Sequence, residues 1–254
     1  MKKKKKNPAL IVIFIIALFI FLFAVIKLGS VYFRYQKEDS VYKNLENYAA
    51  VGAATPENEK NAESAYVSPV DFSSLQEINP DTVGWIYFET MDINYPIVQG
   101  EDDDFYLHHS FEKEESVSGC IFLDTESAPD FSSDNSFVYG HNMKDKSMFA
   151  KLNQYTEESF YLENKTFLIY TPTETRRYEI YSCYPAALDS DSFTYSFENK
   201  EDYAKWQDTV KNRSLYDTGV TPDPEQPTVT LMTCTPKGSN YRFLVHAKLK
   251  EVIR

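Results

Sequence analysis

The chain opens with an uninterrupted apolar run. Residues 9–26, ALIVIFIIALFIFLFAVI, contain no charged or polar side chain, and five lysines at 2–6 precede them. As a helix, this run is about long enough to cross the roughly 30 Å core of a bilayer. A cleaved signal peptide would have a shorter apolar run and a small-x-small cleavage site. We therefore expect residues 8–28 to be an uncleaved anchor, with residues 1–7 in the cytoplasm and the rest outside the cell.

Residues 29–70 connect this anchor to the main body of the chain. Residues 31–49 mix charges with apolar positions at helical spacing, which predicts a juxtamembrane helix. Residues 51–69, VGAATPENEKNAESAYVSP, are small, polar and charged, which predicts a flexible linker.

Residues 71–254 repeat a strand pattern. A short stretch with Phe72, Leu75 and Ile78 at helical spacing comes first. Eight apolar and aromatic runs separated by turn residues follow: GWIYFE, INYPIVQ, SGCIFLD, NSFVYG, KTFLIYT, RRYEIYSCY, TVTLMTC and YRFLVHAKL. Short strands of this kind predict an antiparallel sandwich or barrel. The body is expected to be one mainly β domain.

One segment between the late strands has a helical period instead. Residues 198–216 place Tyr203, Trp206 and Val210 at helical spacing, with acidic side chains before them and basic ones after. This arrangement suits both an amphipathic packing face and the helix dipole. The segment predicts a helix inserted between two strands.

The N-terminal segment is basic, whereas the rest of the chain is acidic. The chain carries 26 basic and 38 acidic residues, and six lysines but no acidic residue lie within residues 1–27. The remainder therefore has a net charge of −18. A body this acidic lacks the basic footprint that nucleic-acid binding requires, so no nucleic-acid partner is expected.

The three cysteines are Cys120, Cys183 and Cys234, and none forms a CxxC pair or has zinc-site spacing. An odd number outside the cell leaves at least one free thiol within a single chain, which makes it a candidate reactive group. Cys183 lies within a strand-like run and is expected to pack in the core.

Cys234 ends the run TVTLMTC, and Arg242 is the second residue of the next run, YRFLVHAKL, after the turn TPKGSN. If the two runs pair across the turn, strand alternation places Cys234 and Arg242 near each other at one sheet edge. Cys234 is then either a small core residue or a nucleophile beside a cation.

A useful thiol nucleophile needs a base or a neighbouring cation. His246 lies four residues beyond Arg242, about 13 Å along the strand, which is too far for a shared site. His141 follows a strand and a glycine in VYGHNM, so it can reach the same rim as Cys234. No acidic third member is identifiable, and Asn142 is expected to point away because it is the neighbour of His141.

The segment EDDDFYLHHSFE contains three aspartates, Asp102 to Asp104, and the histidines His108 and His109. These are metal-ligand types, but adjacent histidines point apart in an extended chain and the spacing is not that of a calcium loop. We expect a solvated loop and no metal site.

The sequence TLMTC with Arg242 eight residues after Cys234, together with VYGHNM around His141, resembles the sortases, cysteine transpeptidases of Gram-positive cell surfaces. The similarity extends from about Asn79 to the end of the chain and is closest to class B. Residues 79–111 resemble the opening strands of that class, and the insertion at 198–216 resembles its long loop between strands six and seven. The segment GCIFLD has Cys120 where the class usually has serine, so Cys120 is interpreted as a structural substitution.

The resemblance implies an eight-stranded β-barrel with N-terminal helices and no cofactor. Cys234 would attack the threonine carbonyl of a surface-protein sorting signal, and His141 would protonate the departing amine. Arg242 would position the substrate and stabilise the oxyanion. An amine of peptidoglycan or of its lipid-linked precursor would then accept the acyl group. Thr233 either helps to shape the substrate site or simply packs.

Other interpretations stay open from the residues alone. The enzyme could polymerise pilins, although the lid and C-terminal hydrophobic span typical of that class are not evident. It could be a cysteine peptidase that uses water as acceptor. Cys234, His141 and Arg242 could also be a packed thiol, a turn histidine and a surface arginine in a non-enzymatic, membrane-anchored β domain.

Overall fold

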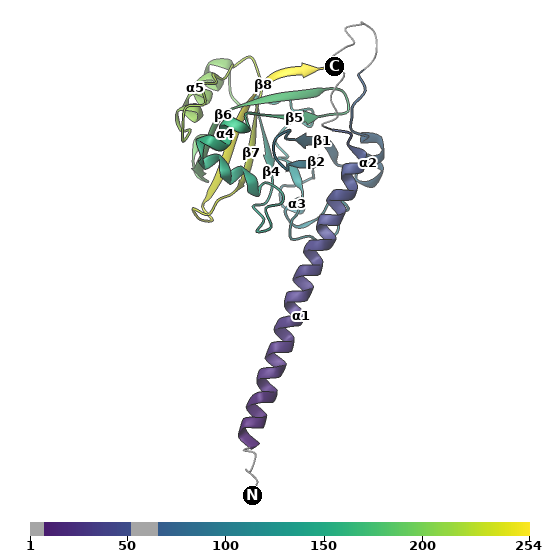
Figure 1. Ribbon diagram of the computed structural model, residues 1–254. Helices are drawn as coiled ribbons and strands as arrows, with labels where there is room; N and C mark the ends of the chain where they lie inside the picture. Colours follow the sequence, from purple (N-terminus) through teal and green to yellow (C-terminus); the bar gives the residue numbers. More distant parts are fainter. Residues whose placement is uncertain (1–7, 52–65) are drawn as a thin grey trace, which may run out of the picture. The chain divides into compact units, whose positions relative to one another are not determined.

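The computed structural model describes residues 8–51 and 66–254 (Figure 1). The chain divides into two compact units, Met1–Lys43 and Asn44–Arg254, and each is considered by itself. The second unit holds every strand.

The first unit is dominated by α1, a helix that runs without interruption from Pro8 to Leu45. Its apolar side chains from Val12 to Phe33 are exposed, and the helix is long and apolar enough to cross a membrane. The predicted juxtamembrane helix over 31–49 is helical as far as Leu45 and is continuous with the apolar run, because no proline after Pro8 breaks the hydrogen-bond ladder. Of the predicted linker at 51–69, residues 52–65 lie outside the described part of the chain.

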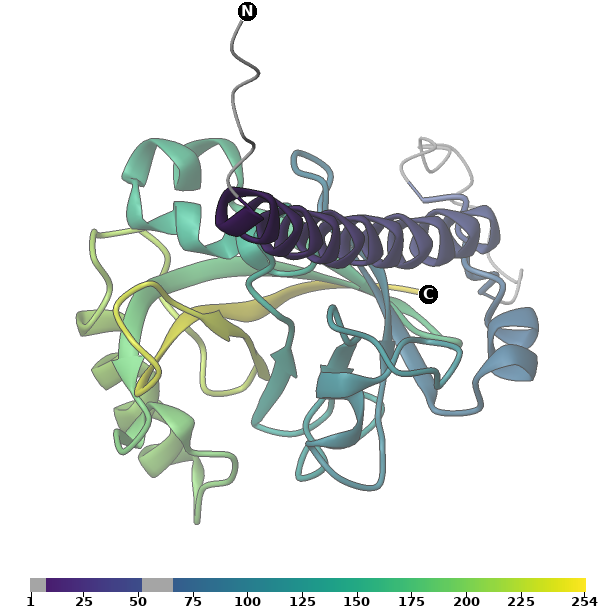
Figure 2. The ribbon, with the colours of Figure 1, turned by 90° about the horizontal axis from the view of Figure 1, so that it is seen from below.

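The second unit is a closed β-barrel with the strand order β1-β2-β3-β4-β7-β8-β6-β5 (Figures 1 and 2). Each predicted run contains a strand: β1 Thr82–Tyr87, β2 Asn94–Val98, β3 Ile121–Leu123, β4 Asn135–Tyr139, β5 Thr166–Tyr170, β6 Thr175–Ala187, β7 Thr228–Cys234 and β8 Tyr241–Ile253. The predicted mainly β class is therefore confirmed, and the barrel is the architecture adopted.

The pairing is mixed rather than purely antiparallel as expected. β2 pairs with β3 in parallel, and β4 pairs with β7 in parallel, while the other neighbours are antiparallel. Parallel neighbours need a crossover connection, which local turn signals along the sequence do not reveal. The β4–β7 pairing depends on a crossover that includes β5, β6 and the helical insertion.

Short helices flank the strands: η1 Glu46–Tyr48, α2 Phe72–Ile78, α3 Phe105–His108, η2 Ala150–Thr156, α4 Glu158–Glu163, η3 Asp191–Phe193 and α5 Lys200–Asn212. The predicted helix at Phe72 is confirmed as α2, which Asp71 caps by accepting a hydrogen bond from the amide of Ser74. A capping side chain satisfies one of the amides that a helix start leaves without a partner.

The predicted inserted helix is confirmed as α5, which Asn199 caps. Tyr203, Trp206 and Val210 are buried in a cluster with Met232 of β7 and Leu244 of β8. The insertion therefore covers the outer face of the barrel over these strands. Because their inner face is also buried, β7 is buried on both faces until its last residue, Cys234.

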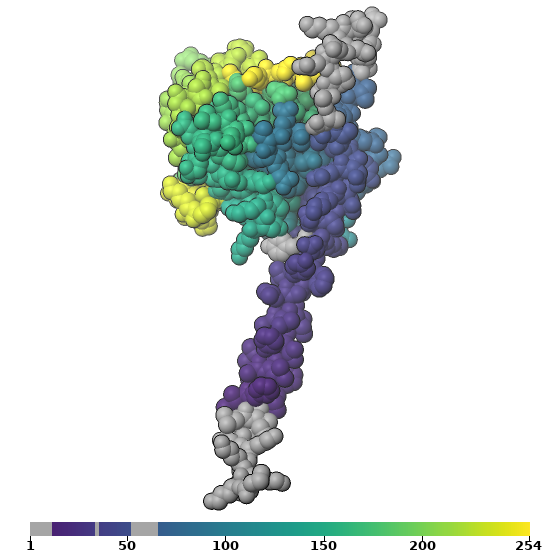
Figure 3. All heavy atoms as spheres, in the orientation of Figure 1, coloured from purple at the N-terminus to yellow at the C-terminus, as the bar shows by residue number. Residues whose placement is uncertain are grey.

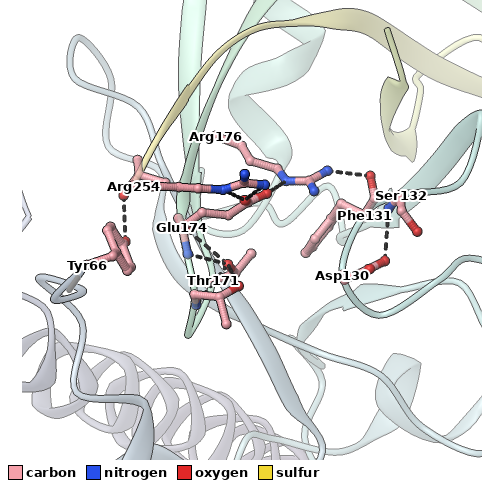
Figure 4. Close-up of polar contacts among 10 residues, drawn as sticks. Tyr66, Asp130, Phe131, Ser132, Thr171, Glu174, Arg176 and Arg254 are labelled. Atoms are coloured by element: carbon pink, nitrogen blue, oxygen red, sulfur yellow. Dashed lines mark hydrogen bonds and ion pairs between the residues drawn. The ribbon is translucent and has the colours of Figure 1, made fainter. Parts of the chain in front are cut away.

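An ion cluster centred on the buried carboxylate of Glu174 joins two arginines of the barrel, Arg176 and Arg254 (Figure 4). Glu174, in the turn between β5 and β6, accepts hydrogen bonds from Arg176 Nε at 2.5 Å and from Arg254 Nε at 2.7 Å. Arg176 also donates to the carbonyl of Phe131 at 2.6 Å. The cluster lies beside the C-terminal end of β8, where Thr175 pairs with Ile253. Along the extended strand, Ile253 is about 36 Å from Arg242.

Candidate active site

Cys234 is the one exposed cysteine of the three, and Cys120 and Cys183 are buried. It lies on the last position of β7, whose preceding residues are all buried. Cys183 is fully buried on β6, and burial raises the pKa of its thiol to about 12. Cys120 is also buried, with its sulfur 3.4 Å from the carbonyl oxygen of His109. Only Cys234 combines a free thiol with access from solvent, since the expected core packing of Cys183 is confirmed.

The side chain of Cys234 lies on the outer face of β7, at the end of the strand. Strand alternation puts Cys234 on the same face as Met232, which the insertion covers, and Thr233 on the opposite, inner face. Thr233 is 2% exposed, and its Oγ1 has no hydrogen-bond partner within the described chain. The structure therefore places the Thr233 side chain inside the barrel and the Cys234 side chain where the cover of the insertion ends.

Arg242 pairs directly with Cys234 across the β7–β8 ladder, as the sequence predicted. The turn that joins them projects at the surface, as the yellow lower-left edge of Figure 3 shows. The Nη1 group of Arg242 donates to the carbonyls of Ser239 at 2.8 Å and Tyr241 at 3.0 Å. Both bonds use Nη1, so the hydrogens of Nε and Nη2 remain uncommitted by them. The guanidinium is therefore held at the base of the turn with donors to spare.

His141 reaches the same edge from the neighbouring strand. β4 and β7 run in parallel with Tyr139 opposite Met232, so His141 and Cys234 each lie two residues beyond a paired position. The amide of Gly140 donates to the carbonyl of Met232 at 3.1 Å and continues the ladder by one bond. Adjacent strands are about 4.8 Å apart, so the two side chains start from neighbouring positions.

Gly140 permits this approach because no other residue fits there. A Cβ at this position would come within 2.5 Å of the Ile121 side chain and 2.7 Å of the Phe149 ring. The glycine before His141 in VYGHNM therefore has a packing reason.

The imidazole of His141 is oriented by a backbone carbonyl rather than by an acidic side chain. Its Nε2 lies 2.8 Å from the carbonyl oxygen of Leu107 in α3. A carbonyl can only accept a hydrogen bond, so Nε2 carries a hydrogen and Nδ1 is the nitrogen available to the thiol. Sequence reasoning missed Leu107 because a backbone carbonyl has no sequence signature.

The segment that supplies Leu107 is more ordered than the solvated loop expected from its charges. Asp102 accepts hydrogen bonds from the amides of Asp104 and Phe105, and α3 follows. His109 stacks on the ring of Phe105 with centroids 4.0 Å apart. Within the described residues, no group of three or more potential metal ligands gathers here or elsewhere. The segment's contribution to the site is thus the Leu107 carbonyl.

Two asparagine side chains converge on the backbone of Cys234. Asn142 Nδ2 and Asn153 Nδ2 each donate to the Cys234 carbonyl oxygen at 3.0 Å. Asn142 was expected to point away from its neighbour His141, and its side chain binds the Cys234 carbonyl rather than the imidazole. The chain turns after His141: the amide of Phe149 donates to the His141 carbonyl, and Asn142 forms a bridge with Met148. Nothing in the sequence around Asn153, on η2, indicated its contact.

The insertion is also tied to the strand that carries His141. Tyr139 and Tyr195 both donate to the buried carboxylate of Asp124, and their hydroxyls lie 3.0 Å apart. Burial raises the pKa of both phenols, that of Tyr195 to about 12, so both stay protonated as donors. These bonds hold Tyr195, three residues before the insertion, beside the end of β4, two residues before His141.

His246 takes no part in this arrangement, as predicted. It is fully buried on β8, with Nδ1 2.8 Å from Thr230 Oγ1 and Nε2 3.2 Å from the hydroxyl of Tyr184. Burial lowers its pKa to about 3, with Arg213 adding to the effect, so the ring is neutral at physiological pH. Of His141 and His246, the two histidines on or next to the strands beside Cys234, only His141 reaches the edge where Cys234 lies.

The chain matches known proteins over most of its length. A family model described as "Sortase domain" matches residues 86–250. A protein named "Sortase B" from Listeria monocytogenes is 31% identical over 223 residues, which cover 87% of each chain.

Solved structures agree with these matches in fold as well as in sequence. Clostridium perfringens sortase B is 37% identical with a TM-score of 0.67, covering 71% of this chain and all of that one. A Staphylococcus aureus sortase B–substrate complex is 31% identical with a TM-score of 0.67, covering 71% of this chain and 84% of that one. The similarity therefore includes the barrel and the strands that carry the three candidate side chains.

Proposed function

The chain belongs to the sortase family, with sortase B proteins among its relatives, and on this premise we propose that it anchors surface proteins to the cell wall as a cysteine transpeptidase. One observation carries the proposal. The exposed Cys234 lies opposite Arg242, and His141 ends the neighbouring strand at the same edge.

In the first step, the sulfur of Cys234 attacks the threonine carbonyl of a sorting signal, at a Thr–Gly or similar bond. A sulfur–carbon bond forms, and the carbon–nitrogen bond of the scissile peptide breaks. The proton of the Cys234 thiol passes to Nδ1 of His141, and the imidazole then gives it to the departing nitrogen, so that the amine leaves as a neutral group. Nδ1 carries this proton because Nε2 already donates to the Leu107 carbonyl.

Arg242 stabilises the negative charge that develops on the carbonyl oxygen. Its guanidinium remains charged at any physiological pH and offers several N–H donors in a fixed plane. Donors that are already in place when the oxyanion forms require little reorganisation. The bonds from Nη1 to the carbonyls of Ser239 and Tyr241 support this role, because they hold the guanidinium without using the hydrogens of Nε and Nη2.

In the second step, an amine of peptidoglycan or of its lipid-linked precursor attacks the thioester. The new amide bond replaces the sulfur–carbon bond, and the thiol regains its proton. A thioester keeps the acyl group reactive toward amines, so the transfer needs no external energy source. This suits a reaction outside the membrane.

The substrate is proposed to be a peptide that binds at the edge where β4 and β7 end. The cluster that α5 covers ends at Met232, which leaves the position of Cys234 open to a peptide. A related staphylococcal sortase B has been solved with its substrate. Thr233 contributes here through the position of its strand, since its side chain is buried.

The proposed location is the outer face of the membrane of a Gram-positive-type bacterium. α1 is long and apolar enough to be the single anchor, and the lysines at 2–6 favour a cytoplasmic N-terminus. The active site then faces the cell wall, where surface proteins and acceptor amines meet.

Mass spectrometry of products tests the function. The full chain in detergent is incubated with a panel of sorting-signal peptides, alone or with triglycine or a peptide containing diaminopimelate. The proposal predicts a ligated product only when an amine is present. Hydrolysis unaffected by every amine would instead indicate water as acceptor, and lysine isopeptides between pilin-derived peptides would indicate a pilin polymerase.

A further inference from the structure

The Cys234 carbonyl is an unusual acceptor for a strand end, since two side-chain amides from separate elements bind it. Asn142 follows β4 and Asn153 lies on η2, and each Nδ2 is 3.0 Å from the same oxygen. A carbonyl oxygen has two lone-pair directions, so the pair of amides can fill both.

The two amides continue the β4–β7 ladder where β4 has ended. Carbonyls of residues i and i+2 in a strand point to the same neighbour, so Met232 and Cys234 both direct their oxygens toward β4. Met232 receives the backbone amide of Gly140. Continuing the register by two residues would place His141 opposite Cys234, but β4 has already ended. The side-chain amides of Asn142 and Asn153, rather than a backbone amide, donate to the Cys234 carbonyl.

The residues after Cys234 do not supply this support. They form the turn to β8, in which Gly238 has a φ of +133°, a conformation that suits glycine alone. A nucleophile between a strand end and such a turn is free to rotate its last peptide plane, which moves the Cβ–Sγ bond. Two bonds to the carbonyl fix that plane.

Asn142 also couples the two reacting side chains. It is the neighbour of His141, whose own carbonyl accepts the amide of Phe149. One side chain therefore ties the backbone that carries the imidazole to the backbone that carries the thiol.

We propose that Asn142 and Asn153 are positioning residues that hold the Cys234 carbonyl so that the thiol points at His141 and the scissile carbonyl. This rests on the proposed transpeptidase function. Neither side chain needs to touch the substrate; each acts through the peptide plane after Cys234. Losing one neutral hydrogen bond of this kind is expected to slow acylation about three- to tenfold.

The test is single-turnover acylation of Cys234 in the full chain, measured with Asn142→Ala, Asn153→Ala and the double variant. Matched controls are Lys144→Ala and Gln154→Ala, which remove exposed side chains from the same two segments. The expected result is a three- to tenfold lower acylation rate for each asparagine variant, with KM within about twofold of wild type and Tm within about 2 °C.

A spectroscopic readout separates positioning from packing. Labelling with [1-¹³C]cysteine gives three carbonyl signals, and Cys234→Ser identifies one of them. Each asparagine variant should move that signal toward the value of a carbonyl with fewer hydrogen bonds and leave the other two in place. Asn142→Asp and Asn153→Asp keep the side-chain size without the donor, and should move the signal and slow acylation as the alanine variants do.

The inference is overturned if the asparagine variants acylate like the controls, if the Asp variants keep the wild-type rate, or if the loss appears in KM or Tm instead. Failure of the proposed function looks different. In that case the wild-type chain forms no thioacyl adduct with any peptide.

Discussion

Cys234 and Arg242 occupy opposite positions at the last paired step of β7 and β8, so one short hairpin presents both the thiol and the guanidinium. Seven residues of sequence lie between them, and the ladder places them opposite each other. Their relationship needs only local pairing, whereas His141 depends on the long-range parallel pairing of β4 with β7.

If Arg242 stabilises the oxyanion, its removal should affect the rate more than substrate binding. Arg242→Ala is expected to lower the acylation rate by about 10²–10³, the typical loss for one oxyanion donor. Arg242→Lys keeps the charge but loses the planar fork, so it should restore the rate only partly. Stopped-flow measurement of the acylation rate tests this. Lys250→Ala, on the same strand, is the control for loss of a positive charge elsewhere. Equal rates for Arg242→Ala and wild type would contradict the oxyanion role of Arg242.

The three cysteines should differ sharply in accessibility. Iodoacetamide under native conditions is expected to alkylate Cys234 alone, because Cys120 and Cys183 are buried and burial raises the pKa of Cys183. Cys183→Ser should keep most activity, since the thiol packs away from the active edge. Peptide mapping by mass spectrometry gives the labelled position, and comparable native labelling of Cys183 would show that the core is open there.

The ion cluster around Glu174 should stabilise the barrel in a pH-dependent manner. Burial alone would raise the pKa of Glu174, but hydrogen bonds from Arg254 and Arg176 outweigh it and hold the pKa below 4.5. The folded state is therefore favoured above about pH 4.5, and this contribution is lost as the pH falls through the lowered pKa.

Glu174→Gln tests this directly. The variant is expected to lower the free energy of unfolding by about 2 kcal/mol at pH 7, because the Arg176 side chain, which is only 12% exposed, loses the carboxylate that pairs with it. The difference from wild type should shrink as the pH falls below about 4.5, because Glu174 then takes up a proton and the ion pairs are lost. Thermal unfolding of the full chain at pH 7 and pH 3 measures this difference in stability, with the exposed Glu163→Gln as control. A difference that is the same at both pH values would rule out the ion pairs as the source of the stabilisation.

The sequence predicted what local physics determines. Alternating apolar runs identified all eight strands, the spacing of Tyr203, Trp206 and Val210 identified α5, and the turn after Cys234 gave its register with Arg242. The prediction of a common rim for Cys234 and His141 agrees with the parallel β4–β7 pairing, although the pairing itself was not foreseen.

The rest could not be predicted because it depends on tertiary contacts without a sequence signal. The Leu107 carbonyl orients His141 through the backbone, so no side chain marks it. Asn153 reaches Cys234 from 81 positions away along the chain. The charges of Asp102 and its neighbours indicated solvent, yet those carboxylates accept backbone amides and begin α3.

The most direct measurement is the intact mass of the full chain after incubation with a sorting-signal peptide. The account predicts a mass increase equal to the acyl fragment, located on Cys234 by peptide mapping, removed by hydroxylamine and absent in Cys234→Ala. His141→Ala should give the adduct at a greatly reduced rate. Cleavage of the peptide by Cys234→Ala, or a wild-type adduct on any residue other than Cys234, would contradict the central claim.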